Sequence, residues 1–120
     1  MIEFAAVLAI TLFSLATGAL LLLPWQTLVL TAGWLLAVGT ALGLPTGVLY
    51  HVRLYQTLAP QRLLPDGWYW NPMQYNDLLQ EGDERRRVMP WFWLGAAGFL
   101  LIAIGTVALG GAVVKVYLQP

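Results

Sequence analysis

The residue best suited to chemistry is the single histidine, His51, because the chain has no cysteine. Gly47 precedes it by four residues, which in a helix places both on one face, one turn apart. A neutral imidazole can ligate the magnesium of a chlorophyll-type pigment or one axial face of a haem, and the missing side chain at Gly47 leaves room for the macrocycle. One copy of the chain cannot supply two histidine ligands to a haem.

Over these five residues the spacing resembles the small-xxx-His pattern of bacterial light-harvesting polypeptides. The resemblance implies that His51 is a pigment ligand. The neighbours of His51 favour another interpretation, because Tyr50 and Arg53 place it at the polar end of an apolar run. An interfacial histidine there hydrogen-bonds to lipid headgroups or loop carbonyls. Both interpretations stay open.

The other polar residues do not assemble a catalytic site. The sequence has no second histidine and no glycine-rich phosphate loop. Its acids are concentrated in a charge-mixed stretch, and such stretches are usually solvated ion-pair faces. We therefore predict no catalytic and no metal-binding residue; the stretch contains Asp77, Glu81, Asp83, Glu84, Arg85, Arg86 and Arg87.

The composition indicates where these residues must be positioned. Of the 120 residues, 59% are hydrophobic and 10% are charged, whereas a soluble domain carries about 25% charged residues. The mean hydropathy is +0.70. A formal net charge of zero argues against nucleic acid, since phosphate binding needs a surplus of Lys and Arg. The composition predicts an all-α integral membrane protein without a soluble substrate.

Three apolar runs, at about residues 2–23, 28–50 and 91–117, each reach the length of about 20 residues that crosses a bilayer core. Pro24 and Trp25 separate the first two runs and predict a tight hairpin. The first run lacks a basic segment before it, which favours an uncleaved span over a signal peptide. We expect one membrane domain over residues 1–120, with a loop at residues 51–90. The helix of the second run should project past Tyr50 until Pro60 stops it.

Basic residues predict the orientation, because short loops rich in Lys and Arg stay in the cytoplasm. Lys115 is the exception near the end of the third run. We expect a cytoplasmic loop and N-terminus and a periplasmic C-terminus, in a bacterial inner membrane. Five of the six basic residues lie in the loop: Arg53, Arg62, Arg85, Arg86 and Arg87.

The loop contains three consecutive aromatic residues, Trp68, Tyr69 and Trp70. Their rings carry a polar tip, which suits a membrane surface, a subunit interface or a ligand contact. Asn71 as N-cap with Pro72 after it predicts a short amphipathic helix that ends about ten residues later, near Gly82. Aromatic residues also open the third run, among them Trp91 and Trp93.

Gly39, Gly43 and Gly47 recur every four residues and share one face of the second run. In lipid, a glycine face lets a helix or a flat ligand approach closely. The helix can belong to this chain or to a partner. Pro45 predicts a kink near Leu42 and Gly43. No charged residue lies near the middle of any run, so an ion path through this chain alone is not expected.

These observations predict a non-catalytic accessory subunit of a bacterial energy-transducing complex, photosynthetic or respiratory. Its expected partners are other membrane subunits and lipids, and it would contact bacteriochlorophyll, carotenoid, quinone or haem held by those subunits. Two alternatives are open. One is a stand-alone homo-oligomeric membrane enzyme or small-molecule binder, and the other is a pigment- or haem-binding protein that uses His51.

Overall fold

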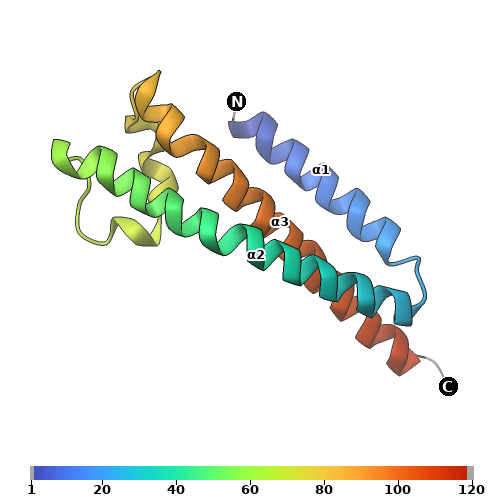
Figure 1. Cartoon of the computed structure of the whole chain (residues 1–120). Coiled ribbons are helices and arrows are strands. Elements are labelled where there is room, and N and C mark those ends of the chain that lie inside the picture. The colour runs from blue at the N-terminus through green and yellow to red at the C-terminus, as the bar shows by residue number, and fades with distance from the viewer. Residues whose placement is uncertain (1, 119–120) are drawn as a thin grey trace. The chain divides into compact units, whose positions relative to one another are not determined.

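The computed structural model describes residues 2–118, in which every regular element is a helix. The long helices are α1 (Ile2–Leu20), α2 (Trp25–Leu58) and α3 (Asp83–Leu118) (Figure 1). Each is long and apolar enough to cross a membrane. Three short 3-10 helices lie between α2 and α3: η1 (Ala59–Gln61), η2 (Trp68–Trp70) and η3 (Pro72–Leu78). The predicted all-α class with three apolar helices is confirmed.

The ends of the helices differ in part from the sequence prediction. As expected from the sequence, α2 runs past Tyr50 and gives way to the 3-10 helix that contains Pro60. Helix α3 begins at Asp83, so it includes a polar turn ahead of the apolar run predicted from residue 91. The Glu84 carboxylate accepts a hydrogen bond from the Gln80 backbone N–H at 3.2 Å, which supports this early start.

The chain divides into two compact units, each containing parts of α2 and α3. The helical unit comprises Met1–Ala41 and Gly98–Pro120, and the loop unit comprises Leu42–Ala97. The boundary between the units in α2 follows Ala41. The Ala41 carbonyl receives no helical hydrogen bond from residue 45, because Pro45 has no backbone N–H. Helix α2 is nevertheless continuous there, and the predicted kink stays a prediction.

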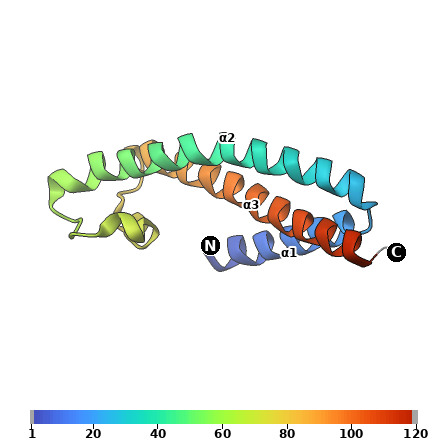
Figure 2. The ribbon, with the colours of Figure 1, turned by 90° about the horizontal axis from the view of Figure 1, so that it is seen from below.

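In the helical unit, α2 and α3 run side by side in two perpendicular views (Figures 1 and 2). Leu28, Ala32, Ala108 and Ala112 form the buried core between them. Small residues recur at seven-residue spacing along the contact, a repeat that keeps one face of a helix turned toward its neighbour. They are Ala32 and Gly39 on α2, and Gly98, Gly105 and Ala112 on α3.

Helix α1 buries little of its surface. Thr17 is its one buried residue between Glu3 and Leu20, and the hydroxyl of Thr17 donates to the Phe13 carbonyl at 2.8 Å. Large apolar side chains face outward, among them Phe4 and Ile10, which are 70% and 65% exposed. This surface needs lipid or another protein to cover it.

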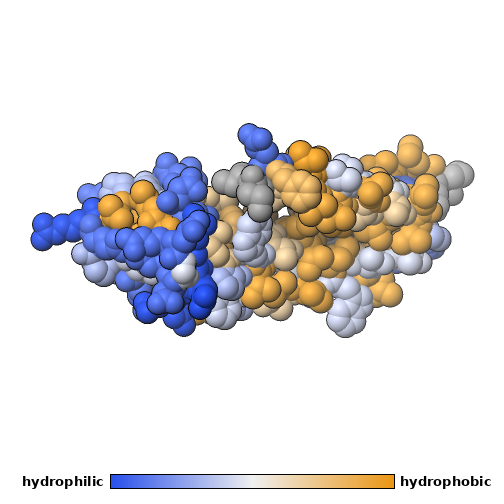
Figure 3. All heavy atoms as spheres, turned by 90° about the horizontal axis from the view of Figure 1, so that it is seen from above, coloured by the Kyte–Doolittle hydropathy of each residue, from blue (hydrophilic) through white to orange (hydrophobic). Residues whose placement is uncertain are grey.

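The loop unit has a core of a different kind. Tyr50, Leu54 and Leu58, spaced by four on α2, are buried with Leu79 and Val88. Hydrophilic side chains gather over this unit, whereas hydrophobic ones cover much of the helical unit (Figure 3). Partly buried hydrophobic side chains pack against this core: Leu64, Trp68, Tyr75, Met89, Trp91 and Phe92.

Candidate functional site

A buried hydrogen bond attaches the loop to α2. The Tyr50 hydroxyl donates to Oδ1 of Asn76, a residue of η3. Both side chains are buried. A buried polar group without a partner would cost about 1–3 kcal/mol, so this pair selects one position for η3 against α2. Sequence reasoning missed Asn76, because its partner lies 26 residues away in the chain.

The helix predicted after Asn71 is present, but it is shorter and of another type. It is a 3-10 helix that ends at Leu78, and the Asn71 side chain makes no capping bond. Asn76 is the buried residue of this helix, and Leu79, which follows it in an extended conformation, is buried as well. The Leu79 N–H donates to the Asn76 carbonyl at 3.2 Å. Gly82 does not end this helix. It lies directly before α3 and has a φ of +97°, a conformation that glycine adopts readily.

Trp68 connects the loop to α2 through its ring. Its centroid lies 6.0 Å from that of His51 and 5.9 Å from that of Tyr55, on which it stacks. The ring centroid of Tyr50 in turn lies 5.2 Å from that of Phe92 in α3. Aromatic pairs of this kind contribute about 0.5–1.5 kcal/mol each beyond their buried area. The rings of Tyr50, His51, Tyr55, Trp68 and Phe92 therefore connect α2, the loop and α3.

The aromatic residues singled out in the sequence have different environments. Trp68 is half-buried, whereas Tyr69 and Trp70 are 54% and 84% exposed. Trp91 packs against the core of the loop unit, and Trp93 is 51% exposed. Tyr69, Trp70 and Trp93 are thus open to lipid or a partner, while Trp68 and Trp91 also support the fold.

The His51 ring is held by a hydrogen bond to its own helix. Its Nδ1 lies 2.7 Å from the Gly47 carbonyl oxygen, and since a carbonyl only accepts, Nδ1 is the donor. In a neutral imidazole this tautomer leaves the lone pair on Nε2. A Cβ added to Gly47 would meet no atom within 4 Å. In Glu3–Leu118 no three His, Cys, Asp or Glu side chains are grouped as a metal site. The ligand assignment stays a prediction.

The three consecutive arginines do not act as one patch. Arg85 is half-buried, and its Nη2 lies 3.5 Å from the Asn76 carbonyl oxygen, to which it donates. Its Nε is buried without a hydrogen-bond partner among residues 2–118. Arg86 and Arg87 are exposed. A shallow polar depression beside them is lined by Gln80, Glu81, Asp83, Glu84 and Arg87.

The three glycines of the predicted glycine face differ in what they contact. A Cβ added to Gly39 would lie 2.8 Å from the Gly98 carbonyl oxygen and 2.9 Å from the Ile102 amide nitrogen, so Gly39 packs within its own chain. Gly43 is half-buried. Gly47 has open space in its Cβ direction.

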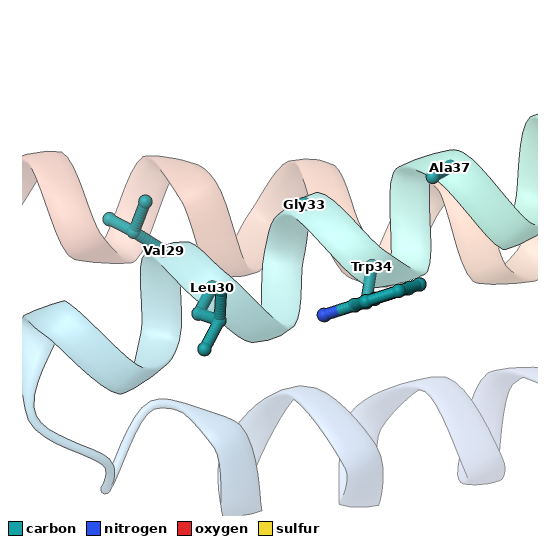
Figure 4. A pocket seen from close by; sticks show the side chains of 5 residues that line it. All are labelled: Val29, Leu30, Gly33, Trp34 and Ala37. Carbon is teal, nitrogen blue, oxygen red and sulfur yellow. The ribbon is translucent and has the colours of Figure 1, made fainter.

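Other glycines of the helical unit face outward on all three helices. Among residues 2–118, a Cβ added to Gly18, Gly33 or Gly110 would meet no atom within 4 Å. Gly33 lies in an open apolar groove of about 380 Å³ on α2 (Figure 4). Sequence reasoning did not single out Gly33, although its four-residue spacing from Ala37 was a signal that it shared with Gly39 and Gly43. The groove is lined by Val29, Leu30, Gly33, Trp34 and Ala37.

Lys115, the one basic residue outside the predicted loop, has a structural partner. Its ammonium donates to the carbonyl oxygen of Leu23, in the segment that follows α1. The ammonium thereby gives a hydrogen-bond donor to a backbone carbonyl of the turn between α1 and α2.

Comparison of the chain with protein-family models, with curated proteins and with solved structures finds no match.

Proposed function

We propose that this protein is a non-catalytic accessory subunit that packs against other membrane helices through the open glycines of its helical unit. The observation that supports this proposal is that α1, α2 and α3 each present a glycine, Gly18, Gly33 or Gly110, at which an added Cβ would meet no atom of the described residues within 4 Å. Exposed apolar residues surround them, including Leu30 and Trp34 at 66% and 67% exposure.

The open glycines are unfavourable within the isolated chain. A glycine inside a helix costs about 0.5–1 kcal/mol relative to alanine. At Gly39 and Gly105 a Cβ would be crowded by the neighbouring helix, so close packing offsets that cost. At Gly33 no internal contact offsets it. Close approach of a partner helix, the main use of small residues in lipid, would do so.

The test compares two outward-facing positions of α2, Gly33 and Val38. Gly33→Leu should leave the chain folded and should not lower its stability, because leucine favours a helix more than glycine does. It should nevertheless release a tagged chain from its larger complex on a native gel. Val38→Leu adds a methylene group to another exposed position of α2 and should leave the large species intact. A chain that is monodisperse alone, with no larger species in native membranes, would contradict the proposal.

The setting that we propose is an energy-transducing complex of a bacterial inner membrane, photosynthetic or respiratory. The chain would be a hairpin of α1 and α2 followed by a cytoplasmic loop and α3, with the N-terminus inside and the C-terminus outside. The absorption spectrum of the large species would identify pigment or haem held by partners. A small colourless species would favour a stand-alone homo-oligomeric enzyme or small-molecule binder.

The absence of cysteine makes the topology directly testable. A cysteine at Ser14 should resist water-soluble thiol reagents, because Ser14 lies within the apolar helix α1. A cysteine at the exposed Gln80 should react only from the cytoplasmic side. Reaction at Gln80 from the periplasmic side alone would reverse the proposed orientation.

A second candidate function is pigment or haem binding at His51. It is favoured by the hydrogen bond from Nδ1 to the Gly47 carbonyl, which in a neutral imidazole leaves the lone pair on Nε2, and by the open space in the Cβ direction of Gly47. His51→Leu should then remove the absorption band of the purified chain. A band that survives this substitution excludes His51 as the ligand.

A further inference from the structure

The loop unit marks the edge of its own apolar segments. On α2 the apolar run ends at Tyr50, and Arg53 is the first charge beyond it. On α3, Arg87 is the last charge before the apolar run that includes Phe92. The rings of Tyr50 and Phe92 lie 5.2 Å apart, so both helices cross this edge at one level. Tyrosine and tryptophan are enriched at such an edge between membrane and water.

The loop returns to this edge after leaving it. Helix α2 continues seven residues beyond His51 to Leu58, roughly 10 Å at 1.5 Å per residue. Trp68, much later in the chain, nevertheless contacts the His51 and Tyr55 rings. Figures 1 and 2 both show the loop after α2 folding back alongside that helix. The segment that follows Trp68 therefore lies close to the edge.

Large side chains of this returning segment remain uncovered. Tyr69, Trp70 and Met73 are 54%, 84% and 58% exposed. Tyr69 contacts both tryptophans, with ring centroids 6.2 Å from Trp68 and 5.5 Å from Trp70. The exposed pair is thus attached to the ring of Trp68, which holds it beside α2.

The exposed segment continues an apolar stripe of α2. Val48, Val52 and Tyr55 share one helix face and are 60%, 44% and 55% exposed. The stripe starts inside the apolar run and ends at Tyr55, which stacks on Trp68. The apolar stripe of α2 is therefore connected to Tyr69 and Trp70 through the rings of Tyr55 and Trp68.

We propose that Tyr69, Trp70 and Met73 form a wedge that inserts into the headgroup layer of the membrane crossed by α2 and α3. Lipid is the occupant, because the wedge lies at the edge of the apolar run and continues its surface. The amphipathic rings of Trp and Tyr suit this layer, with the apolar ring toward the acyl chains and the polar tip toward water. The wedge would hold the loop flat on the membrane.

The experiment places nitroxide spin labels on single cysteines in the full chain, which has no cysteine of its own. Variants Trp70→Cys and Met73→Cys are reconstituted in vesicles of phosphatidylcholine with phosphatidylglycerol. Accessibility to oxygen, which partitions into lipid, is compared with accessibility to a water-soluble nickel chelate. Gln80→Cys provides the aqueous control, and Val48→Cys provides the lipid-facing control.

The expected result is a ratio of oxygen to nickel accessibility at positions 70 and 73 that lies severalfold above the ratio at position 80 and below that at position 48. A ratio equal to that at position 80 would place the segment in water and overturn the proposal. Low accessibility to both reagents would indicate a protein contact and would also overturn it. Met73→Cys keeps Trp70 in place, so the test does not depend on removing the main anchor.

The vesicles contain no other protein, which separates this proposal from the accessory-subunit function. Insertion without a partner would stand even if Gly33→Leu left every native complex intact. Failure of insertion would leave the glycine test unaffected.

Discussion

The same two helices, α2 and α3, are joined in two different ways in the two units. In the helical unit the contact depends on glycines, such as Gly39 and Gly105, whose lack of a side chain lets the two backbones approach closely. In the loop unit it depends on large ones, such as Tyr50 and Phe92. Lipid is as apolar as a leucine side chain, so burial drives little helix association inside a membrane and close backbone contact matters more. Near water, burial of large apolar surface is again favourable.

The largest effect should come from truncating the core of the loop unit. Leu54 is fully buried there, so Leu54→Ala should cost about 2–5 kcal/mol in the free energy of unfolding of that unit. Faster proteolysis and hydrogen exchange in residues 61–82 would report it. Val52→Ala, on the exposed face of the same helix, is the control. Equal effects of both substitutions would mean that aromatic and aliphatic burial does not hold this unit.

The next largest effect should come from adding volume to the close contact of the helical unit. Gly39→Leu forces a side chain against the Gly98 carbonyl and should cost about 1–3 kcal/mol. Unfolding of the purified chain in mild detergent with increasing dodecyl sulfate measures it. Gly33→Leu on the same helix should change this midpoint little. A comparable loss at both positions would remove the distinction between occupied and open glycines.

A smaller effect is expected from the buried hydrogen bond of the loop unit. Tyr50→Phe keeps the ring against Phe92 but leaves Oδ1 of Asn76 without its donor. We expect a loss of about 1–2 kcal/mol, visible as faster hydrogen exchange in η3. Tyr55→Phe removes a hydroxyl from an exposed ring and should be nearly neutral. If the two substitutions behaved alike, the loop would be held by packing alone.

The smallest effect should arise at Lys115. Lys115→Met removes the donor to the Leu23 carbonyl while keeping much of the aliphatic side chain, and should cost about 0.5–1 kcal/mol, as the loss of one partly buried hydrogen bond. The dodecyl sulfate midpoint again measures it, and Lys115→Arg should restore most of the loss. Complete insensitivity of the midpoint would show that the carbonyl is equally well satisfied without the ammonium.

Several features of the fold could be predicted from the sequence, because they depend on neighbouring residues. Apolar run length predicted three helices capable of crossing a membrane, and Pro60 predicted where α2 would stop. The turn chemistry around Asn71 and Gly82 predicted a short helix in the right place. Its type and end were wrong, because the burial of Asn76 and Leu79 selected 3-10 winding.

The candidate sites depended much more on contacts between distant residues. A spacing of four placed Gly39 and Gly47 on one face, but the approach of α3 decided that Gly39 is occupied and Gly47 open. The run of three aromatic residues predicted an interface, but the stacking of Trp68 on Tyr55 decided which two rings remain exposed.

The sequence alone determined that the chain is apolar, helical and able to cross a membrane three times, since hydropathy and helical periodicity are properties of adjacent residues. The tertiary structure alone decided which glycines are closed, which arginine turns inward and how Asn76 reaches Tyr50. Those outcomes depend on side chains brought together from far apart in the chain, where the burial of one group requires a partner supplied by another element.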